Sequence, residues 1–521
     1  MTVTSNLTII SNCDSETNWN SNDPSFGLDD IRKEGSYSLS MDVDIETSYM
    51  RYDLGSAQDY SNRVLYVWMM SMTPSFLDTK ANGGMQIFIE DSSGNQSYWY
   101  VGGSDTYKGG WKCFSVYCSS TPDANNGTNA DPSQVRYIGV RYKGIAKSKL
   151  SANCYVDFVR YGSATQPAVK ILGGSASSPL TWEDLFIDDD SACIGVIQKG
   201  EGTYLLNGGV QFGDESSGDV YFQDKLQVLQ WEDVPSIPDQ FKLSVVNNPS
   251  GIASVIFGEK SDEVGLGGGL IRAKNTLYPY KVEVTDADVS TFKLCGVTFL
   301  DASTITFPSE EVGAEALNCL FQSCDRVDPS SSTFRFCTFV DAKDVALLLP
   351  SSHNVKDCSF LSNPKAIEID TSGTFTFDNL TFTGNGIDIY NTSGGTVVIQ
   401  CVNGSNPSSS SSPNGGAVEI QNVVYLRIYV KDSEGEPIPN ARVAIYKSSD
   451  MTQLMNELTD GNGKAEETFQ YPGSDIEVII RVRKSTAGAT RYIPIETIGV
   501  IGVDGLTQYV TMYVDTSLGG G

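Results

Sequence analysis

Residues 334–361 read FRFCTFVDAKDVALLLPSSHNVKDCSFL and contain the triplet Cys-x-Phe twice, at Cys337 and at Cys358. The same register gives a series of phenylalanines at intervals of 22, 18, 21 and 22 residues, namely Phe299, Phe321, Phe339, Phe360 and Phe382. Each follows a smaller apolar residue by two positions, in the order Val297, Cys319, Cys337, Cys358 and Leu380. Residues two apart in a strand share a face, and a period near twenty is typical of a chain that coils onto itself. The stretch therefore predicts a parallel β-solenoid with stacked inner columns of Phe and of Cys, Val or Leu.

The eleven cysteines are spread over the chain without any Cys-x-x-Cys pair or zinc spacing. In the coil we interpret cysteine as a small, adaptable apolar side chain. The rival interpretation, a row of metal-binding thiolates, would require four converging ligands. We therefore expect no cofactor in the coil.

The coil is predicted to occupy residues 163–422, with roughly twelve turns of about 21 residues. Asparagines near the turns are expected to adopt left-handed backbone geometry, namely Asn363, Asn379, Asn385 and Asn403. Residues 406–416, NPSSSSSPNGG, are of low complexity and are expected to form a flexible excursion. The sequence SGDVYFQDKLQVLQW and the isolated Cys-x-Phe turns resemble right-handed β-helices from appendages of tailed bacteriophages.

The first segment, residues 1–162, consists of short alternating stretches separated by Gly, Asn and Asp clusters. In SYSLSMDVDI one face holds the larger apolar side chains, Tyr37, Leu39, Met41, Val43 and Ile45. Such alternation predicts an antiparallel two-sheet sandwich with a jelly-roll arrangement.

Three short motifs of this segment resemble carbohydrate-binding-module jelly rolls. They are Glu34-Gly35-Ser36-Tyr37-Ser38-Leu39, Gly110-Trp111-Lys112 and Val156-Asp157-Phe158. The resemblance implies a structural Ca²⁺ ion held by Glu34 and Asp157. It also directs attention to exposed rings that could stack on a sugar, and the candidates are Tyr98, Trp99, Tyr100, Trp111 and Tyr142. In an alternating strand Tyr98 and Tyr100 share one face and Trp99 the other, so one set is core and the other is available for binding.

The third segment, residues 423–521, begins with VVYLRIYVKDSEGEPIPNARVAIYK. Its strand–turn order resembles the transthyretin-like, carboxypeptidase-regulatory-like β-sandwich family. The whole chain is thus predicted to be all-β: an N-terminal jelly roll, a central right-handed parallel β-helix and a C-terminal immunoglobulin- or transthyretin-like sandwich.

Charge and motifs exclude several activities. The net charge of −28 disfavours nucleic-acid binding, because each phosphate contact needs a Lys or Arg. No apolar run is long enough to cross a bilayer, and no leader peptide is visible. The single histidine, His353, is expected in a surface turn, and no serine elbow accompanies it.

These features predict a non-enzymatic structural protein of a tailed phage: a fibre, spike or capsid decoration on the outside of the virion. Its expected partners are other virion proteins, host surface glycans and further copies of itself, with a trimer favoured. Two alternatives remain. A tailspike depolymerase would use carboxylates on the coil, such as Asp325, Asp328, Asp341, Asp344, Asp357 and Asp370. A bacterial surface adhesin would need a secretion or sorting signal.

Overall fold

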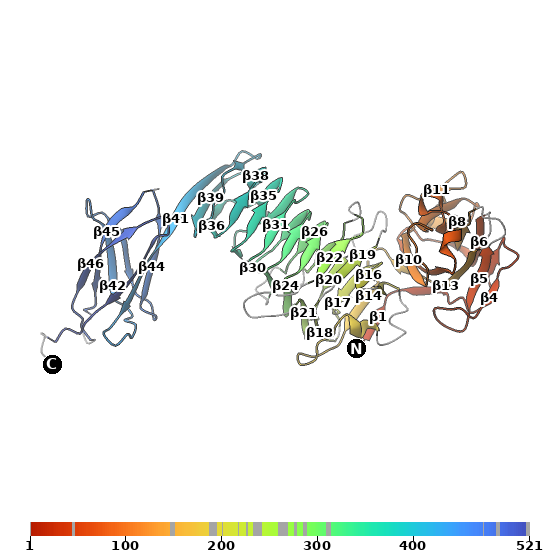
Figure 1. Ribbon diagram of the computed structural model, residues 1–521, viewed down its shortest axis with the longest axis horizontal. Coiled ribbons are helices and arrows are strands. Elements are labelled where there is room, and N and C mark those ends of the chain that lie inside the picture. The colour runs from red at the N-terminus through yellow and green to blue at the C-terminus, as the bar shows by residue number, and fades with distance from the viewer. Residues whose placement is uncertain are drawn as a thin grey trace. The chain divides into compact units, whose positions relative to one another are not determined.

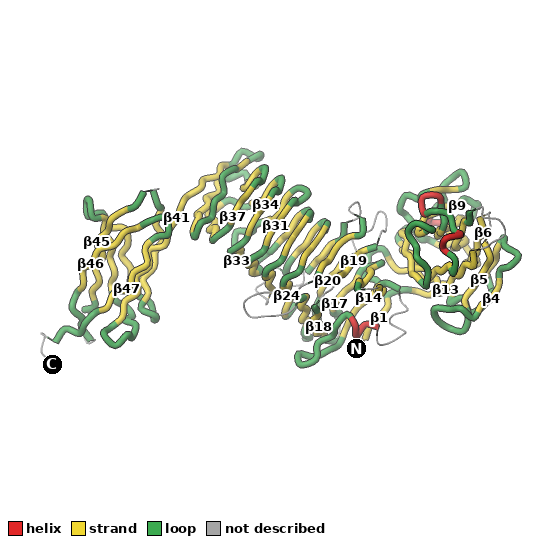
Figure 2. Tube along the Cα trace, in the orientation of Figure 1, coloured by secondary structure: helices red, strands yellow, loops and turns green. Residues whose placement is uncertain are grey.

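The computed structural model describes residues 2–43, 47–145, 152–186, 195–200, 202–216, 218–225, 228–232, 242–248, 250–258, 269–275, 279–284, 289–308, 314–472, 474–485 and 490–516. These residues divide into two compact units. The first holds residues 1–333 and 340–343, and the second holds residues 334–339 and 344–521. Strands dominate both units. The helices among the described residues are short 3₁₀ turns, η1 (Pro74–Phe76), η2 (Lys80–Asn82), η3 (Pro132–Gln134) and η4 (Glu183–Phe186) (Figure 2). Among the described residues no helix is long and apolar enough to cross a membrane.

The first unit begins with a sandwich of two antiparallel sheets. We call one the platform sheet, in the order β11 (Ala124–Asn125), β9 (Gln96–Gly102), β8 (Met85–Asp91), β12 (Val135–Lys143), β6 (Thr47–Gln58) and β3 (Trp19–Ser21). The other, the docking sheet, runs β10 (Lys112–Tyr117), β7 (Arg63–Ser71), β13 (Ala152–Ser163), β5 (Ser38–Val43) and β4 (Gly27–Asp29), and β2 (Thr8–Ser11) also pairs with β13.

The apolar alternation predicted for β5 places Leu39, Met41 and Val43 in the sandwich core. Tyr37 precedes this strand and is 44% exposed, and Ile45 lies outside the described residues. The platform sheet contributes Ile87, Trp99 and other alternate residues to the same core.

The rest of the first unit is a coil of three sheets (Figure 1). Its strands pair in parallel from turn to turn, except that residues 197–200 pair antiparallel with residues 203–206 in the second sheet. The first sheet holds β14 (Val169–Leu172), β17 (Val210–Phe212), β20 (Lys242–Val245), β23 (Lys281–Glu283), β26 (Thr304–Thr306) and β29 (Arg326–Asp328). The second holds β15 (Ile197–Gly200), β16 (Thr203–Leu206), β19 (Val228–Trp231), β22 (Leu270–Ala273), β25 (Thr298–Leu300) and β28 (Leu320–Gln322). The third holds β18 (Val220–Asp224), β21 (Ala253–Phe257), β24 (Thr291–Cys295) and β27 (Ala314–Leu317).

The second unit contains the same three kinds of sheet. Its first sheet holds β32 (Val345–Leu348), β35 (Lys365–Ile369), β38 (Ile387–Asn391) and β40 (Ser410–Ser411). Its second sheet holds β34 (Ser359–Leu361) and β37 (Thr381–Thr383). Its third sheet holds β33 (Asn354–Lys356), β36 (Gly373–Asp378), β39 (Thr396–Val402) and β41 (Ala417–Lys431). The strands β30 (Thr333–Arg335) and β31 (Thr338–Val340) contain residues of both units. The predicted parallel β-helix is therefore confirmed, and its right-handedness stays a prediction.

The predicted phenylalanine column is present within each unit. The rings of Phe299 and Phe321 stack at 5.3 Å, and Phe360 stacks on Phe339 at 4.9 Å and on Phe382 at 5.1 Å. The neighbouring cysteines are buried. The thiol of Cys358 donates a hydrogen bond to the carbonyl oxygen of Lys356 at 3.2 Å. This sulfur therefore also satisfies a backbone acceptor at the corner of the coil.

The asparagines divide into two kinds. Asn379 and Asn403 have positive φ angles of 52° and 51°, as predicted for corners. Asn363 and Asn385 do not, and the prediction of left-handed geometry was wrong for them. Their side chains form an internal ladder instead, because each Nδ2 donates to a carbonyl oxygen of the preceding turn, that of Phe339 and that of Phe360 at 3.1 Å.

The serine-rich stretch is also more ordered than predicted. Its strand β40 pairs with β38, and the carboxylate of Asp388 accepts hydrogen bonds from the backbone N–H groups of Ser408 and Ser409. Serines therefore continue the coil here by hydrogen bonding rather than by apolar packing.

The outer face of the docking sheet packs on the first turns of the coil. In β7 both faces are buried, and Tyr66 and Trp68 point away from the sandwich core. Asn207 of the coil donates through Nδ2 to the carbonyl oxygen of Cys113 at 2.6 Å. In addition, the first strand of the chain, β1 (Thr2–Ser5), pairs antiparallel with β14 of the coil.

The second unit ends in another sandwich, whose core includes Leu426, Ile445 and Ile480. Strand β41 pairs with β39 of the coil through residues 417–422 and then, from Val423 onward, with β44 (Lys464–Gln470). It also pairs with β47 (Leu506–Thr511). The opposite sheet, which we call the arginine sheet, runs β43 (Gln453–Leu458), β42 (Arg442–Lys447), β45 (Ile476–Arg483) and β46 (Ile495–Ile501).

Candidate functional site

The outer face of the platform sheet carries a row of four side chains on four adjacent strands. Tyr49 of β6 lies opposite Arg141 of β12, which lies opposite Gln86 of β8, and Gln86 lies opposite Tyr100 of β9. Their chain neighbours Met50, Ile87 and Trp99 point into the core, so the row faces outward. At about 4.8 Å per strand the row is about 14 Å long. We call it the platform row.

Arg141 has unused hydrogen-bonding capacity. Its guanidinium carbon lies 3.9 Å from the ring centroid of Tyr98, and among the described residues it makes neither an ion pair nor a hydrogen bond. Burial lowers the pKa of Arg141, but a guanidinium stays charged at neutral pH. The row thus contains a cation whose N–H donors are available to a ligand.

Gln86 adds an unused acceptor beside this cation. The side chain is 4% exposed, and its Nε2 atom donates to the carbonyl oxygen of Gly83 at 2.6 Å. Its Oε1 atom is buried and has no partner. A buried polar atom without a partner costs about 1–3 kcal/mol, and rotation of the Gln86 side chain toward a ligand hydroxyl group would remove that cost.

The neighbouring side chains hold the row in place. Arg51 forms an ion pair with Glu90 at 2.5 Å, and its Nε atom donates to the Asn20 side chain at 2.8 Å. The Phe88 ring is 1% exposed and packs edge-on against Tyr49 at 6.3 Å. Gly139 makes room for this ring, because an added Cβ would lie 2.7 Å from it. The row is therefore supported by packed and ion-paired neighbours.

The structure places the predicted sugar-binding rings in three different environments. Tyr100 is half-buried in the platform row, and Tyr98 shares its face but is 6% exposed under Arg141. The predictions for Trp99 and Tyr142 were wrong, because both rings lie in the sandwich core and present no face to a ligand. Trp111 is half-buried beside the docking sheet, 6.3 Å from Tyr155 and apart from the row.

The implied calcium site does not fit the residues present. Asp157 is fully buried, and its carboxylate accepts backbone hydrogen bonds from Lys33, Glu34 and Phe158. Glu34 forms an ion pair with Arg160 at 3.2 Å. Burial raises the pKa of Asp157 to about 7. The described residues contain no group of three or more His, Cys, Asp or Glu side chains that could hold a metal ion. N–H donors and a guanidinium converge on these two carboxylates, where Ca²⁺ would require further oxygen ligands.

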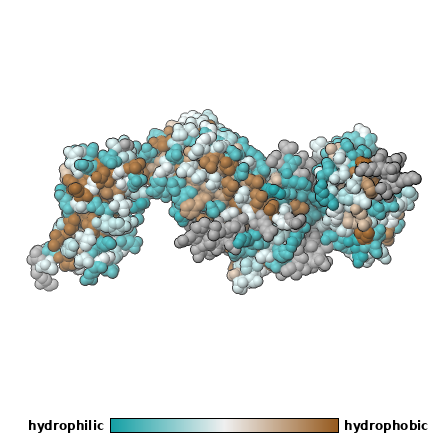
Figure 3. Space-filling model, in the orientation of Figure 1, coloured by the Kyte–Doolittle hydropathy of each residue, from teal (hydrophilic) through white to brown (hydrophobic). Residues whose placement is uncertain are grey.

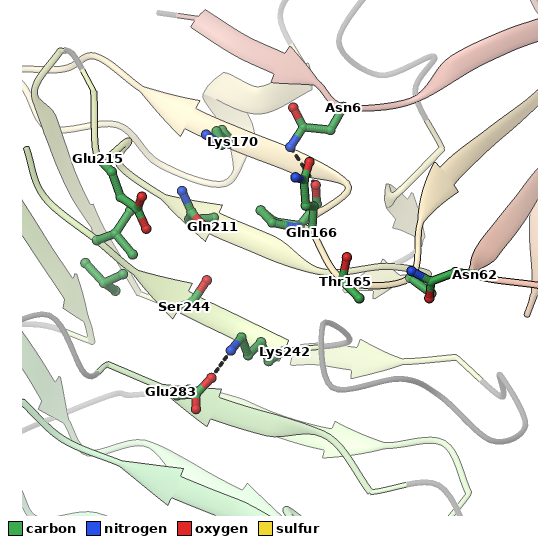
Figure 4. A pocket seen from close by; sticks show the side chains of 14 residues that line it. Asn6, Asn62, Thr165, Gln166, Lys170, Gln211, Glu215, Lys242, Ser244 and Glu283 are labelled. Carbon is green, nitrogen blue, oxygen red and sulfur yellow. Dashed lines mark hydrogen bonds and ion pairs between the residues drawn. The ribbon is translucent and has the colours of Figure 1, made fainter.

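A cavity of about 720 Å³ lies in the first unit (Figure 4). One side is formed by two loops, which contain Asn62 and residues 164–167, and the other side is formed by the first sheet of the coil. On the coil side Lys170, Gln211 and Ser244 stand on successive strands. The lining contains no aromatic side chain, and its lysines are ion-paired, Lys170 with Asp214 and Lys242 with Glu283. The cavity therefore offers hydrogen bonds without a surface on which a sugar ring could stack.

Three of the carboxylates considered for a depolymerase have structural roles. Asp341 and Asp357 occupy left-handed corners with φ angles of 51° and 56°. Asp344 forms an ion pair with Lys365 at 2.8 Å. Such side chains stabilise turns and pairs between neighbouring strands, and a glycosidase would require two of them across a bound sugar.

His353 lies between β32 and β33, as predicted, but its side chain is less exposed than a surface-turn residue would be. Its ring is half-buried and stacks on Phe375 at 6.2 Å, and its Nδ1 atom is buried without a partner. Burial lowers the pKa of His353 to about 4. The imidazole is therefore neutral at pH 7 and has no catalytic serine or carboxylate partner among the described residues.

We predict that His353 makes the coil less stable as the pH falls from 6.5 to 4. In this window the unfolded chain binds the proton and the folded chain does not, so acidification favours unfolding. His353→Phe keeps a ring on Phe375 and removes the titration. The difference in unfolding free energy between variant and wild type should change across this window and be constant above pH 7. A difference independent of pH would contradict the prediction.

No family model and no curated protein match the sequence. Among solved structures the chain is similar to the family 11 carbohydrate-binding module from Clostridium thermocellum in complex with a β-1,3-1,4-mixed-linked tetrasaccharide. The identity is 12%, the match covers 30% of this chain and 95% of that one, and the TM-score is 0.22. The chain is also similar to the family 11 module of cellulosomal cellulase Lic26A-Cel5E of Clostridium thermocellum. Here the identity is 11%, the match covers 30% of this chain and 94% of that one, and the TM-score is 0.22.

Proposed function

We propose that this protein is a non-enzymatic glycan-binding appendage, and that the platform row binds the sugar. The observation that carries the proposal is the sequence Tyr49, Arg141, Gln86 and Tyr100 across four strands. Half-buried tyrosine rings stand at both ends, and between them lie a cation and an acceptor with unused hydrogen-bonding capacity. Sugar recognition combines these two elements, because a pyranose offers an apolar face and a rim of hydroxyl groups.

The length of the row suits an oligosaccharide of two to three residues. Its rigid support also matters, since a preorganised site loses less side-chain entropy on binding. Arg51 and Phe88 supply that support through the Glu90 ion pair and the Tyr49 contact.

We further propose that the coil and the second sandwich present this face on the exterior of a tailed-phage particle, as a fibre, spike or capsid decoration. Strand pairing from turn to turn in the coil supports a role as a carrier, and the excess of 64 acidic over 36 basic residues favours solubility at high local concentration. A homo-oligomer, with a trimer favoured, and other virion proteins as partners belong to the same proposal. Detection of the protein in purified particles, and its location in an electron-microscopy map, tests this part.

For the glycan site we predict that Arg141→Ala weakens binding about tenfold or more, since a hydrogen bond to a charged group contributes about 1.5–3 kcal/mol. Tyr100→Ala should also weaken binding, because the ring that stacks on the sugar is lost. The measurement is affinity electrophoresis of the full chain in the polysaccharide that a glycan array identifies. Arg136→Ala is the matched control on the same strand, because its guanidinium is bound by Asp53 at 2.8 Å and lies off the row. Absence of any binding on the array, or equal binding by all three variants, would refute the site.

A further inference from the structure

The outer face of the arginine sheet holds two arginines directly opposite one another. Arg442 of β42 pairs with Arg483 of β45 in an antiparallel register. Their chain neighbours Val443 and Val482 are buried in the sandwich core, so both guanidinium groups are on the outside. Directly opposed side chains on neighbouring strands have Cβ atoms about 4.5–5.5 Å apart, and like charges there destabilise the sheet.

Two other arginines of this sandwich are neutralised by carboxylates on a neighbouring strand. Arg481 is paired with Glu496 at 2.7 Å, and Arg427 with Glu466. Arg442, in contrast, donates to the amide oxygen of Asn456 at 2.9 Å, and Arg483 makes no ion pair among the described residues. In a chain with a net charge of −28, two adjacent cations without a carboxylate stand out.

A cavity of about 420 Å³ lies over this pair. Its polar lining includes Arg442, Arg481, Arg483, Tyr446 and Asn456. It also includes Glu496, whose carboxylate is neutralised by Arg481 at 2.7 Å. The guanidinium carbon of Arg481 lies 5.2 Å from the Tyr446 ring, which fixes one wall. The cavity is thus bordered by planar donors that can hold an oxygen acid from two sides.

We propose that Arg442 and Arg483 form an oxyanion-binding site that takes a carboxylate or phosphate group of a ligand or partner. Two guanidinium forks match the paired oxygens of these groups. The bound anion would also remove the repulsion between the two cations. The site is independent of the platform row, which belongs to the other unit.

Isothermal titration of the full chain with inorganic phosphate and, separately, with tricarballylate tests the proposal at constant ionic strength. We expect saturable binding of at least one anion and a loss of at least tenfold in affinity in Arg442→Gln/Arg483→Gln. Arg427→Gln, which removes a paired cation, should bind as the wild type does. Binding of phosphate alone identifies a phosphate ligand, and binding of tricarballylate alone identifies a carboxylate ligand.

A second readout separates a ligand site from a structural role. Without anion and at low ionic strength, Arg483→Gln should increase amide protection against hydrogen exchange in β42 and β45, because one of two repelling charges is gone. Saturating anion should increase protection in the wild type and not in the double variant. Absence of saturable binding by both anions, or reduced protection in anion-free Arg483→Gln, would overturn the proposal.

Discussion

Replacing Phe360 by alanine should destabilise the coil of the second unit by about 3–5 kcal/mol. The ring is fully buried and lies between Phe339 at 4.9 Å and Phe382 at 5.1 Å. Its removal leaves a cavity in the middle of the column, and backbone hydrogen bonds between strands on either side prevent the turns from closing the gap. The cost therefore includes both lost burial and the empty space.

Hydrogen exchange followed by mass spectrometry is the suitable measurement, because a chain with several cores can unfold in several transitions. Peptides covering β34 and β37 should lose protection by about 10² to 10³-fold, since each 1.4 kcal/mol is a factor of ten. Phe336→Ala is the control: that phenylalanine is 47% exposed in the same part of the chain. Equal loss of protection in both variants would show that the column does not stabilise the coil.

Replacing Glu232 by alanine should loosen the attachment of the first sandwich to the coil. The Glu232 side chain is 9% exposed and forms ion pairs with Lys112 of the sandwich at 3.3 Å and with Lys274 of the coil at 2.7 Å. Burial lowers the pKa of Lys112, and Glu232 opposes that shift. Without Glu232 two lysines remain close together with no shared carboxylate.

We expect the Glu232→Ala variant to lose about 2 kcal/mol of stability at this contact. This is less than the roughly 3–5 kcal/mol typical of breaking a fully buried ion pair, because Lys274 is partly solvated. Hydrogen exchange of β10 and β19 should report it. Glu183→Ala, which removes the exposed partner of Lys199, should leave both strands unchanged. Lys112→Met/Glu232→Met should recover much of the protection, since the more buried lysine is then gone and only the partly solvated Lys274 lacks a carboxylate. Failure of Glu232→Ala to affect either strand would contradict this view of the contact.

The sequence was sufficient for the coil because its signal repeats. The spacing of Phe299, Phe321 and the later phenylalanines marks one inward position per turn. Strands with that spacing bury these side chains by pairing with the equivalent strand of the next turn. The fate of Asn363 could not be predicted in the same way. An asparagine is suited both to a left-handed corner and to an internal ladder, and only the position of the Phe339 carbonyl group decides between them.

The candidate site was predicted only in part, for a comparable reason. Alternation separated Tyr98 and Tyr100 from Trp99, but a single strand does not reveal which of its faces is covered. Arg141 and Gln86 were missed because their importance arises from cross-strand neighbours distant in sequence. The docking sheet did leave a signal: β7 contains the unbroken apolar run VLYVWMM, which is typical of a strand buried on both faces.

Strand β41 has a mechanical consequence. It leaves the last turn of the coil and enters the second sandwich as one uninterrupted strand of 15 residues, with hydrogen bonds to β39 and then to β44. A pull applied along this strand would have to shear several of these bonds at once, whereas a loop at the same place would stretch or swivel first. Tension applied to the chain at this point would therefore pass through the joint into the neighbouring strands.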